Sequence, residues 1–186
     1  MKTLTQIFSE LRETMAVVST ELASSFAPGI PAEEAKQLLT KIQFTPGEEL
    51  LELYSLANGS SGAIPLVEIL PGAYFQSLEY AINTFENTTP ITECWGPLAS
   101  SLVVLTDHGG SGYGVRPKTD GGRVVNLGIH EPPSIEFNSL AEMLELSLLC
   151  YREGVFTWAD GMTDADFQKY SELDEEFKRS LGRSKP

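Results

Sequence analysis

The chain contains little cysteine and no long apolar run, and these two absences restrict where the protein can work. Its 186 residues include only Cys94 and Cys150, which are too few and too far apart for a disulfide framework. No run approaches the roughly 18 apolar residues of a membrane-spanning helix, and the N-terminus does not resemble a cleaved signal peptide. We therefore expect a cytoplasmic protein with reduced thiols and no membrane association.

Basic residues are also scarce, and one long stretch has none. The 26 acidic side chains outnumber the 13 basic ones, which gives a formal net charge of −13. This balance opposes nucleic-acid binding, because a phosphate backbone selects Lys and Arg. Between Lys41 and Arg116 there is no Lys or Arg. The acids of this stretch either cover solvated helix faces, as acids commonly do, or form a negative surface for a cationic partner. They are Glu48, Glu49, Glu52, Glu68, Glu79, Glu86, Glu93 and Asp107.

Apolar residues make up 41% of the chain, which suffices for a core, and their spacing predicts several helices. The helix within 44–59 is the best defined. Thr45 is its expected N-cap, Glu48 completes a Thr-x-x-Glu capping box, and Asn58-Gly59 is its expected end. The other expected helices are 3–25, 31–42, 74–85, one opened by a capping box of Ser139 and Glu142, and a last one at 163–181 opened by Thr163 and Asp166.

Short strand-like runs separated by turns occupy the middle of the chain. Pro65 predicts that the first run lies at a sheet edge, because proline cannot donate to a ladder of hydrogen bonds. Since the later runs follow one another with helices before and after, their order predicts an α+β fold. A small antiparallel sheet would be packed with helices on one face. The runs are 64–70, 101–106, 113–116 and 123–129, while 155–161 forms either a last edge strand or a loop.

Asp107-His108 near Ser111 is the pattern closest to a catalytic site. The hydrolase motif Gly-x-Ser-x-Gly fails here, because Tyr113 stands where the second glycine is required. His108 and His130 could also join nearby acids around a metal, but no ligand spacing supports this. We therefore predict no catalytic residue, no metal and no cofactor. A hydrolase or metal enzyme using Asp107, His108 and His130 is the alternative.

Four segments of the chain occur in a recognisable order. They are the helix 44–59 ending in Asn-Gly, the Trp-x-Pro element Trp95-Gly96-Pro97-Leu98, the hairpin of Leu105-Thr106-Asp107 with Gly112-Tyr113-Gly114-Val115, and the closing helix that begins at Ser139. Together they resemble the SUKH superfamily, which comprises the Smi/Knr cell-wall-synthesis regulators and bacterial toxin-immunity relatives. The similarity covers about residues 31–153, so the helices at 3–25 and 163–181 would flank the core of a single domain spanning 1–186. One departure is Thr45, where the family usually has Leu before the Pro.

The resemblance implies a non-enzymatic module that binds another protein. Bacterial members of this family resemble immunity proteins that neutralise toxins, often nucleases. Joined to the stretch without bases, this predicts a basic toxin domain as partner, held by Glu48, Glu52 and Asp107 with Tyr113 beside them. The alternative is a regulatory scaffold with several partners, in which the helix at 163–181 is the docking element. The sequence leaves the oligomeric state open.

Overall fold

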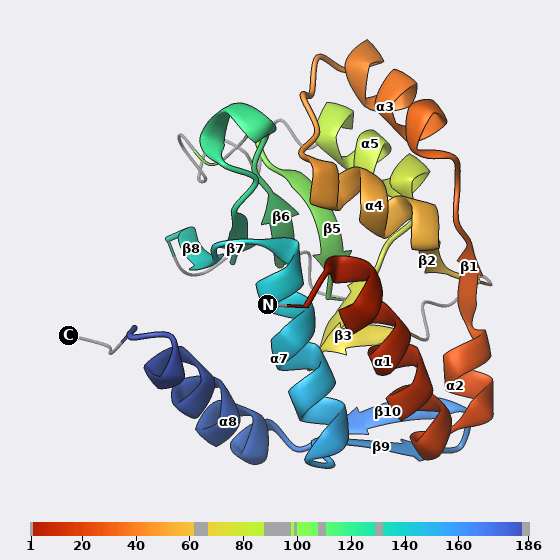
Figure 1. The fold of residues 1–186 in the computed structure, drawn as a ribbon, viewed down its shortest axis with the longest axis vertical. Helices are drawn as coiled ribbons and strands as arrows, with labels where there is room; N and C mark the ends of the chain where they lie inside the picture. Colours follow the sequence, from red (N-terminus) through yellow and green to blue (C-terminus); the bar gives the residue numbers. More distant parts are fainter. Residues whose placement is uncertain are drawn as a thin grey trace.

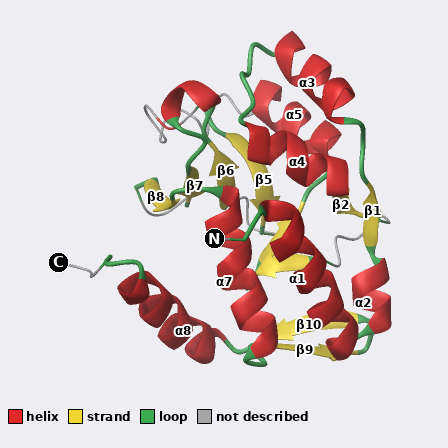
Figure 2. Ribbon diagram, in the orientation of Figure 1, coloured by secondary structure: helices red, strands yellow, loops and turns green. Residues whose placement is uncertain are grey.

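The computed structural model describes residues 2–61, 67–87, 98, 100–107, 111–128 and 132–183. In this part of the chain, helices and an antiparallel sheet form the α+β fold that the sequence predicts (Figure 1, Figure 2). The predicted features at Cys94, Trp95, His108 and His130, together with Pro65, lie outside the described residues.

The main sheet is a meander in which each strand pairs antiparallel with its neighbours in the chain. Its strands are β3 (Glu68–Leu70), β4 (Ala73–Phe75), β5 (Leu102–Thr106), β6 (Gly112–Val115), β7 (Val124–Leu127) and β8 (Ser134–Phe137). β3 is one edge strand of the sheet, where the sequence predicts an edge strand, and β8 is the other edge strand.

The helices of the described residues are α1 (Leu4–Val18), α2 (Thr20–Ser24), α3 (Ala32–Lys41), α4 (Glu48–Leu56), α5 (Leu78–Asn87), α7 (Leu140–Arg152) and α8 (Phe167–Ser180). α5 and α7 pack directly on strands of the main sheet, whereas α2 packs on α1 and α3 packs on α4. In Figure 1, α1, α4 and α7 lie in front of the sheet, and α8 extends to one side. Two small antiparallel pairs complete the fold: β1 (Phe26–Pro28) with β2 (Ala57–Ser60), and β9 (Phe156–Ala159) with β10 (Met162–Ala165).

The core lies between the helices and the sheet. The apolar stripe of α1 is at most 3% exposed, and it packs in one cluster with the stripe of α7 and the inner face of the sheet. Burial of each such side chain stabilises the fold by about 1.5–3 kcal/mol. The stripe of α1 consists of Leu4, Ile7, Phe8, Leu11 and Met15. On the opposite face of the sheet, Val103, Val125 and Leu127 form a smaller buried cluster against Leu98.

The helix predicted at 3–25 is interrupted at Ser19. This residue is extended (φ −159°, ψ 129°), and its hydroxyl accepts a hydrogen bond from the Leu22 N–H at 3.3 Å to begin α2. Serine favours this role because its side chain competes with helical backbone bonds. The prediction of one continuous helix is therefore wrong.

The helix predicted within 44–59 is shorter at both ends. Gly47 is its N-cap and no side chain caps it, so the capping box of Thr45 and Glu48 is wrong. After Leu56 the chain enters β2, and Asn58-Gly59 contacts another part of the fold. The Asn58 Oδ1 accepts a hydrogen bond from the Leu78 N–H at 2.8 Å, in the first turn of α5. Gly59 has a φ of 77°, and a Cβ there would lie 2.5 Å from the Ser77 nitrogen.

Three further element boundaries differ from the prediction. The segment 74–85 begins as β4, because Ala73–Phe75 pairs between β3 and β5, and the helix starts only at Leu78. β8 was not predicted, and 155–161 proves to contain strand β9. Thr163 lies in β10, and Asp166 alone caps α8 by accepting from the Lys169 N–H at 3.0 Å. Across the described ranges, no helix combines the length and hydropathy needed to cross a membrane.

Candidate functional site

The acids of α4 divide between the interior contacts of the fold and the solvent. The Glu52 carboxylate accepts hydrogen bonds from the N–H of Thr5, at 3.0 Å, and from its hydroxyl, in the first turn of α1. Glu48, by contrast, is 91% exposed and forms only a 3.3 Å ion pair with Lys118. Of the two α4 acids predicted to contact a partner, Glu48 faces solvent and Glu52 is engaged by α1.

Glu49 joins α4 to the start of α7. Its Oε2 accepts from the N–H groups of Leu140 at 2.8 Å and Ala141 at 3.3 Å. A carboxylate at this position satisfies two helix-terminal donors and complements the positive end of the helix dipole. In the sequence, Glu49 is only one acid of the stretch without bases, because a cap supplied from about ninety residues away leaves no local pattern.

Other acids of the stretch without bases are also used within the fold. Glu68 is 4% exposed and accepts from the Gly72 N–H at 2.6 Å across the β3–β4 turn. Glu79 accepts from the Asn58 side-chain amide at 3.2 Å. Glu86 is exposed, and Glu93 lies outside the described residues. The stretch is therefore distributed over the fold.

Asp107 holds the turn between β5 and β6. Its Oδ1 accepts from the Ser111 N–H at 2.8 Å, and its own N–H donates to the Ser111 carbonyl at 2.9 Å. Such a contact stabilises a turn in any class of protein. The histidines of the enzyme alternative, His108 and His130, lie outside the described residues, so the structure does not place them beside Asp107.

Tyr113 lies on β6 under α8. Its ring packs against Phe137 with centroids 6.2 Å apart, and its hydroxyl is hydrogen-bonded to that of Tyr170. Burial raises the pKa of Tyr113 to about 12, with a further contribution from the negative charge of Glu136. The phenol is therefore neutral at physiological pH and contributes hydrogen bonding and apolar surface.

A hollow of about 480 Å³ brings Asp107 and Tyr113 together. Its walls come from the β3–β4 turn, the β5–β6 turn, β7 and the first residue of α8. That first residue, Phe167, is 62% exposed. The hollow therefore presents a carboxylate, the Asn126 amide and an exposed aromatic ring on one concave surface. Glu48 and Glu52 do not line it.

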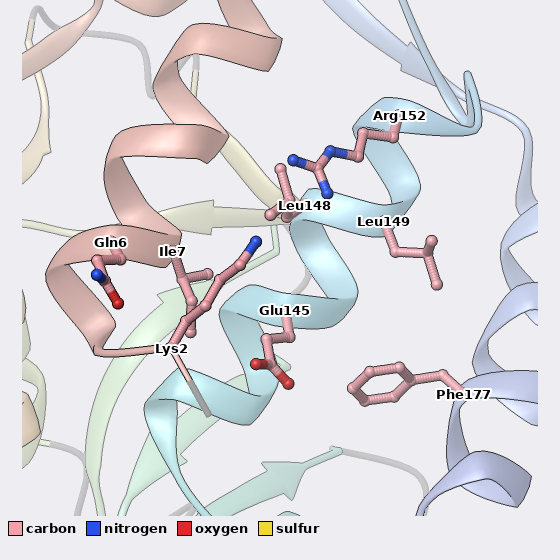
Figure 3. Close-up of a pocket in the computed structure, with 8 residues that line it drawn as sticks. All are labelled: Lys2, Gln6, Ile7, Glu145, Leu148, Leu149, Arg152 and Phe177. Atoms are coloured by element: carbon pink, nitrogen blue, oxygen red, sulfur yellow. The ribbon is translucent and has the colours of Figure 1, made fainter.

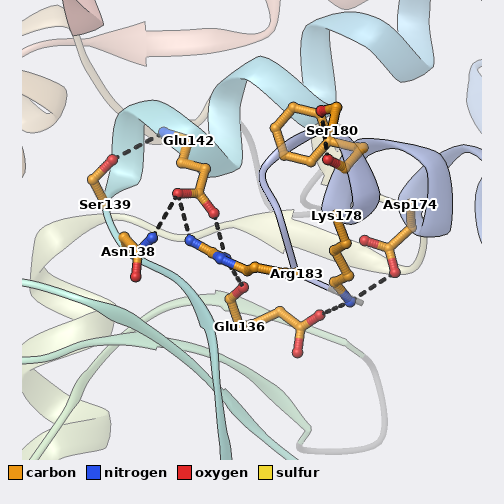
Figure 4. Close-up of polar contacts among 9 residues, drawn as sticks. Glu136, Asn138, Ser139, Glu142, Asp174, Lys178, Ser180 and Arg183 are labelled. Carbon is orange, nitrogen blue, oxygen red and sulfur yellow. Dashed lines mark hydrogen bonds and ion pairs between the residues drawn. The ribbon is translucent and has the colours of Figure 1, made fainter. Parts of the chain in front are cut away.

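At its other end, α8 is held by a group of charged residues that we call the clasp: Glu136, Glu142, Asp174, Lys178 and Arg183. Figure 4 shows Lys178 between Glu136 and Asp174, and Arg183 reaching from beyond the helix end toward Glu142. Arg183 donates to the Glu142 carboxylate at 2.8 Å and to the Glu136 carbonyl at 3.1 Å. Burial alone would lower the pKa of Lys178, but its bonds to Asp174 and Glu136 raise it above the usual value. In the sequence, the only sign of this arrangement is that Lys178 and Arg183 come near or just after the end of the last predicted helix.

The Ser139 hydroxyl caps α7 as predicted, accepting from the Glu142 N–H at 3.1 Å. The Glu142 side chain does not complete the predicted box. It accepts from Arg183 and from the Asn138 amide at 3.2 Å. The Glu142 carboxylate, which the local sequence assigns to the capping box, is therefore bound within the clasp instead.

A second concave surface of about 530 Å³ lies between α1, α7 and α8 (Figure 3). Phe177 points from α8 toward Leu149 of α7, and Lys2 and Arg152 lie on the other side of the groove. Glu10 pairs with Lys2 at 2.7 Å and with Arg152 at 2.6 Å, and these bonds lower the pKa of Glu10. The groove thus combines apolar side chains with two bases in an acidic protein.

The comparison with protein-family models finds no match to this chain. A search among curated proteins likewise finds no match. Within the described residues, no three His, Cys, Asp or Glu side chains are grouped as metal ligands would be. The function is therefore argued from the surfaces of the protein itself.

Proposed function

We propose that the chain is a non-enzymatic protein-binding module of the immunity type, which binds a basic protein domain through the hollow at Asp107, Tyr113 and Phe167. The observation that carries the proposal is this hollow. It places an acidic group and a 62% exposed aromatic ring on one concave surface of a protein with a net charge of −13. Aromatic anchors beside charged groups are typical of the energetically important part of a protein interface.

The charge of the protein selects the class of partner. With 26 acids and 13 bases, the chain attracts cationic surfaces and accelerates their approach. The exposed acids Asp164 and Asp166 lie next to Phe167 in the chain and add negative charge to that segment. A basic toxin domain, such as a nuclease-type domain, has the complementary charge. The resemblance of residues 31–153 to the SUKH superfamily agrees with this class of partner.

The test is capture of the partner from the native cell with matched surface variants. Wild-type protein should retain one basic protein at low salt and release it at high salt. Phe167→Ala should lose that protein, whereas Val17→Ala should retain it, since Val17 is 87% exposed and does not line the hollow. Asp107→Asn keeps an oxygen for the turn and removes the charge, so it should weaken capture. Equal capture by Phe167→Ala and Val17→Ala would refute the hollow as the binding surface.

The groove between α1, α7 and α8 favours a second function, the regulatory scaffold. Its lining combines apolar side chains with Lys2, Arg152 and Glu145, which differs from the lining of the hollow, so it would suit a different partner. Leu149→Ser should then remove one binding protein and leave capture through Phe167 unchanged. If every captured protein depends on Phe167, the scaffold function is wrong.

A further inference from the structure

The outer edge of β8 is a sheet edge that the chain covers with its own C-terminal segment. Because β8 is the last strand of the sheet that the described residues form, the backbone groups on its outer side have no strand partner among those residues. Ile135 in this strand is 46% exposed. The Glu136 carbonyl accepts from Arg183 at 3.1 Å, and the Glu136 carboxylate binds Lys178. Two bases thus occupy this edge.

An irregularity in β8 makes this arrangement possible. Val124 pairs with Phe137 and Val125 pairs with Ile135, so Glu136 is an extra residue in the strand. A bulge of this kind re-aims a side chain and takes a backbone group out of the ladder. Both the carbonyl and the carboxylate of Glu136 are therefore available to bind the basic side chains at and after the end of α8. Figure 4 shows Arg183 and Lys178 approaching Glu136 from that side.

The covering segment packs against the core through side chains that are only partly buried, namely Tyr170, Leu173 and Phe177. No residue of α8, which is described throughout, is fully buried, and Leu181 after the helix is 42% exposed. The clasp also holds the segment through charge, with three acids against two bases. The side chains of these ion pairs are 12–31% exposed, so water and a competing cation can reach them.

We propose that the β8 edge is a second binding site, which takes an extended, basic segment of a partner protein once Lys178 and Arg183 have left it. The partner's strand would pair with the β8 backbone, and its Lys or Arg would replace Lys178 at Glu136. Charge argues against a second copy of this chain as the occupant. A second copy would bring another acidic edge and another net charge of −13 to Glu136. The proposal shares with the proposed function only the basic character of the partner.

The test uses a labelled octapeptide of alternating Lys and Val and the full chain. Arg183→Ala should bind this peptide about tenfold more tightly than wild type, because the variant loses one of the two bases that cover the edge and the segment leaves it more often. Arg179→Ala is the matched control, since Arg179 is an exposed base of the same helix. It should bind as wild type does. Hydrogen exchange should show new protection in 134–137 when the peptide is bound.

Three comparisons test whether strand pairing at the β8 edge causes the tighter binding of the octapeptide. The same peptide with alternate backbone nitrogens methylated keeps its charge and cannot pair as a strand, so its equally tight binding would refute the edge. Sedimentation showing that Arg183→Ala dimerises would refute the choice of occupant. Phe167→Ala should bind the octapeptide as wild type does, which separates failure of this site from failure of the hollow. A thermal melt of Arg183→Ala close to that of wild type would show that the variant is folded.

Discussion

The two terminal helices, α1 and α8, are attached to the same body in different ways. The sequence predicts both as amphipathic helices that flank the 31–153 core. α1 buries five large side chains to at most 3% exposure against α7 and α4, whereas α8 has no fully buried residue and ends in a charged clasp. The first helix is therefore part of the core, and the last is a surface element held by partly buried apolar contacts together with the clasp.

This difference teaches where the protein can change shape. Removing α1 would expose a continuous apolar stripe to water, at a cost of about 1.5–3 kcal/mol for each large side chain. Releasing α8 would uncover the partly buried Tyr113 and the edge of β8 while leaving the α1–α7 core intact. Local opening in proteins occurs where few buried apolar contacts hold an element.

The largest expected effect comes from a substitution in the buried apolar face of α1. Leu11→Ala, at a position that is 0% exposed, should lower the free energy of unfolding by about 2–5 kcal/mol in urea titrations. Leu173→Ala, in the partly buried face of α8, should cost about 1 kcal/mol because less surface leaves water there. Equal losses would show that α8 is as much a part of the core as α1.

A smaller effect is expected from the polar contacts inside the body. Glu49→Ala should lower the free energy of unfolding by about 1–2 kcal/mol, because two N–H groups at the start of α7 lose their acceptor. Glu48→Ala, one residue away and 91% exposed, should change it by less than about 0.5 kcal/mol. Chemical denaturation of the two variants measures the difference. Similar values would mean that the Glu49 cap does not contribute.

Breaking the clasp should act locally. Arg183→Ala should raise hydrogen exchange in 170–180 by about tenfold, while exchange in α1 stays the same. The global free energy of unfolding should fall by no more than about 1 kcal/mol, since the clasp groups are partly exposed. Arg179→Ala should leave both measurements at the wild-type values. A uniform rise in exchange over α1 and α8 would contradict the separation of the two regions.

The smallest effect is a dependence of α8 on alkaline pH. The pKa of Tyr113 is raised to about 12 by burial, and that of Lys178 is raised by its acidic partners, which outweigh its burial. A pKa that is raised in the folded protein contributes stability that is fully present below the ordinary pKa, which is about 10 for Tyr and Lys. That stability is lost as the pH rises toward the raised pKa of the folded protein. Exposure of α8 should therefore begin between pH 10 and 12. In absorbance titrations at 295 nm, Tyr113→Phe should lack a transition near pH 12 that wild type shows. If the variant instead lacks a transition near pH 10, the burial of this phenol is contradicted.

The sequence predicts the fold class correctly because apolar periodicity and turns are local signals. The order of helices, meander and helices predicts the α+β arrangement, and the strand at 102–106 and the helix at 32–41 lie where their patterns place them. One group of errors occurs where a residue serves a distant element. Asn58-Gly59 has the chemistry of a helix end, but it contacts the start of α5.

The candidate site was less accessible to sequence reasoning than the fold. Asp107 and Tyr113 were selected from the hairpin motif, and the structure places both in one hollow. The sequence does not single out Phe167, because its exposure depends on how α8 begins beside the β3–β4 turn. The clasp was missed for the same reason, since Glu136 and Arg183 are distant in the chain and meet only after α8 has folded back.

By itself, the sequence determined the fold class, the excess of acid and the absence of bases between Lys41 and Arg116, because these follow from composition and from patterns a few residues long. Only the tertiary structure decided what each acid does. It made Glu49 and Glu52 caps of distant helices, left Glu48 in solvent and placed Glu136 at a guarded sheet edge. A carboxylate has the same charge in every sequence window, and its role depends on which donors the folded chain brings within hydrogen-bonding distance.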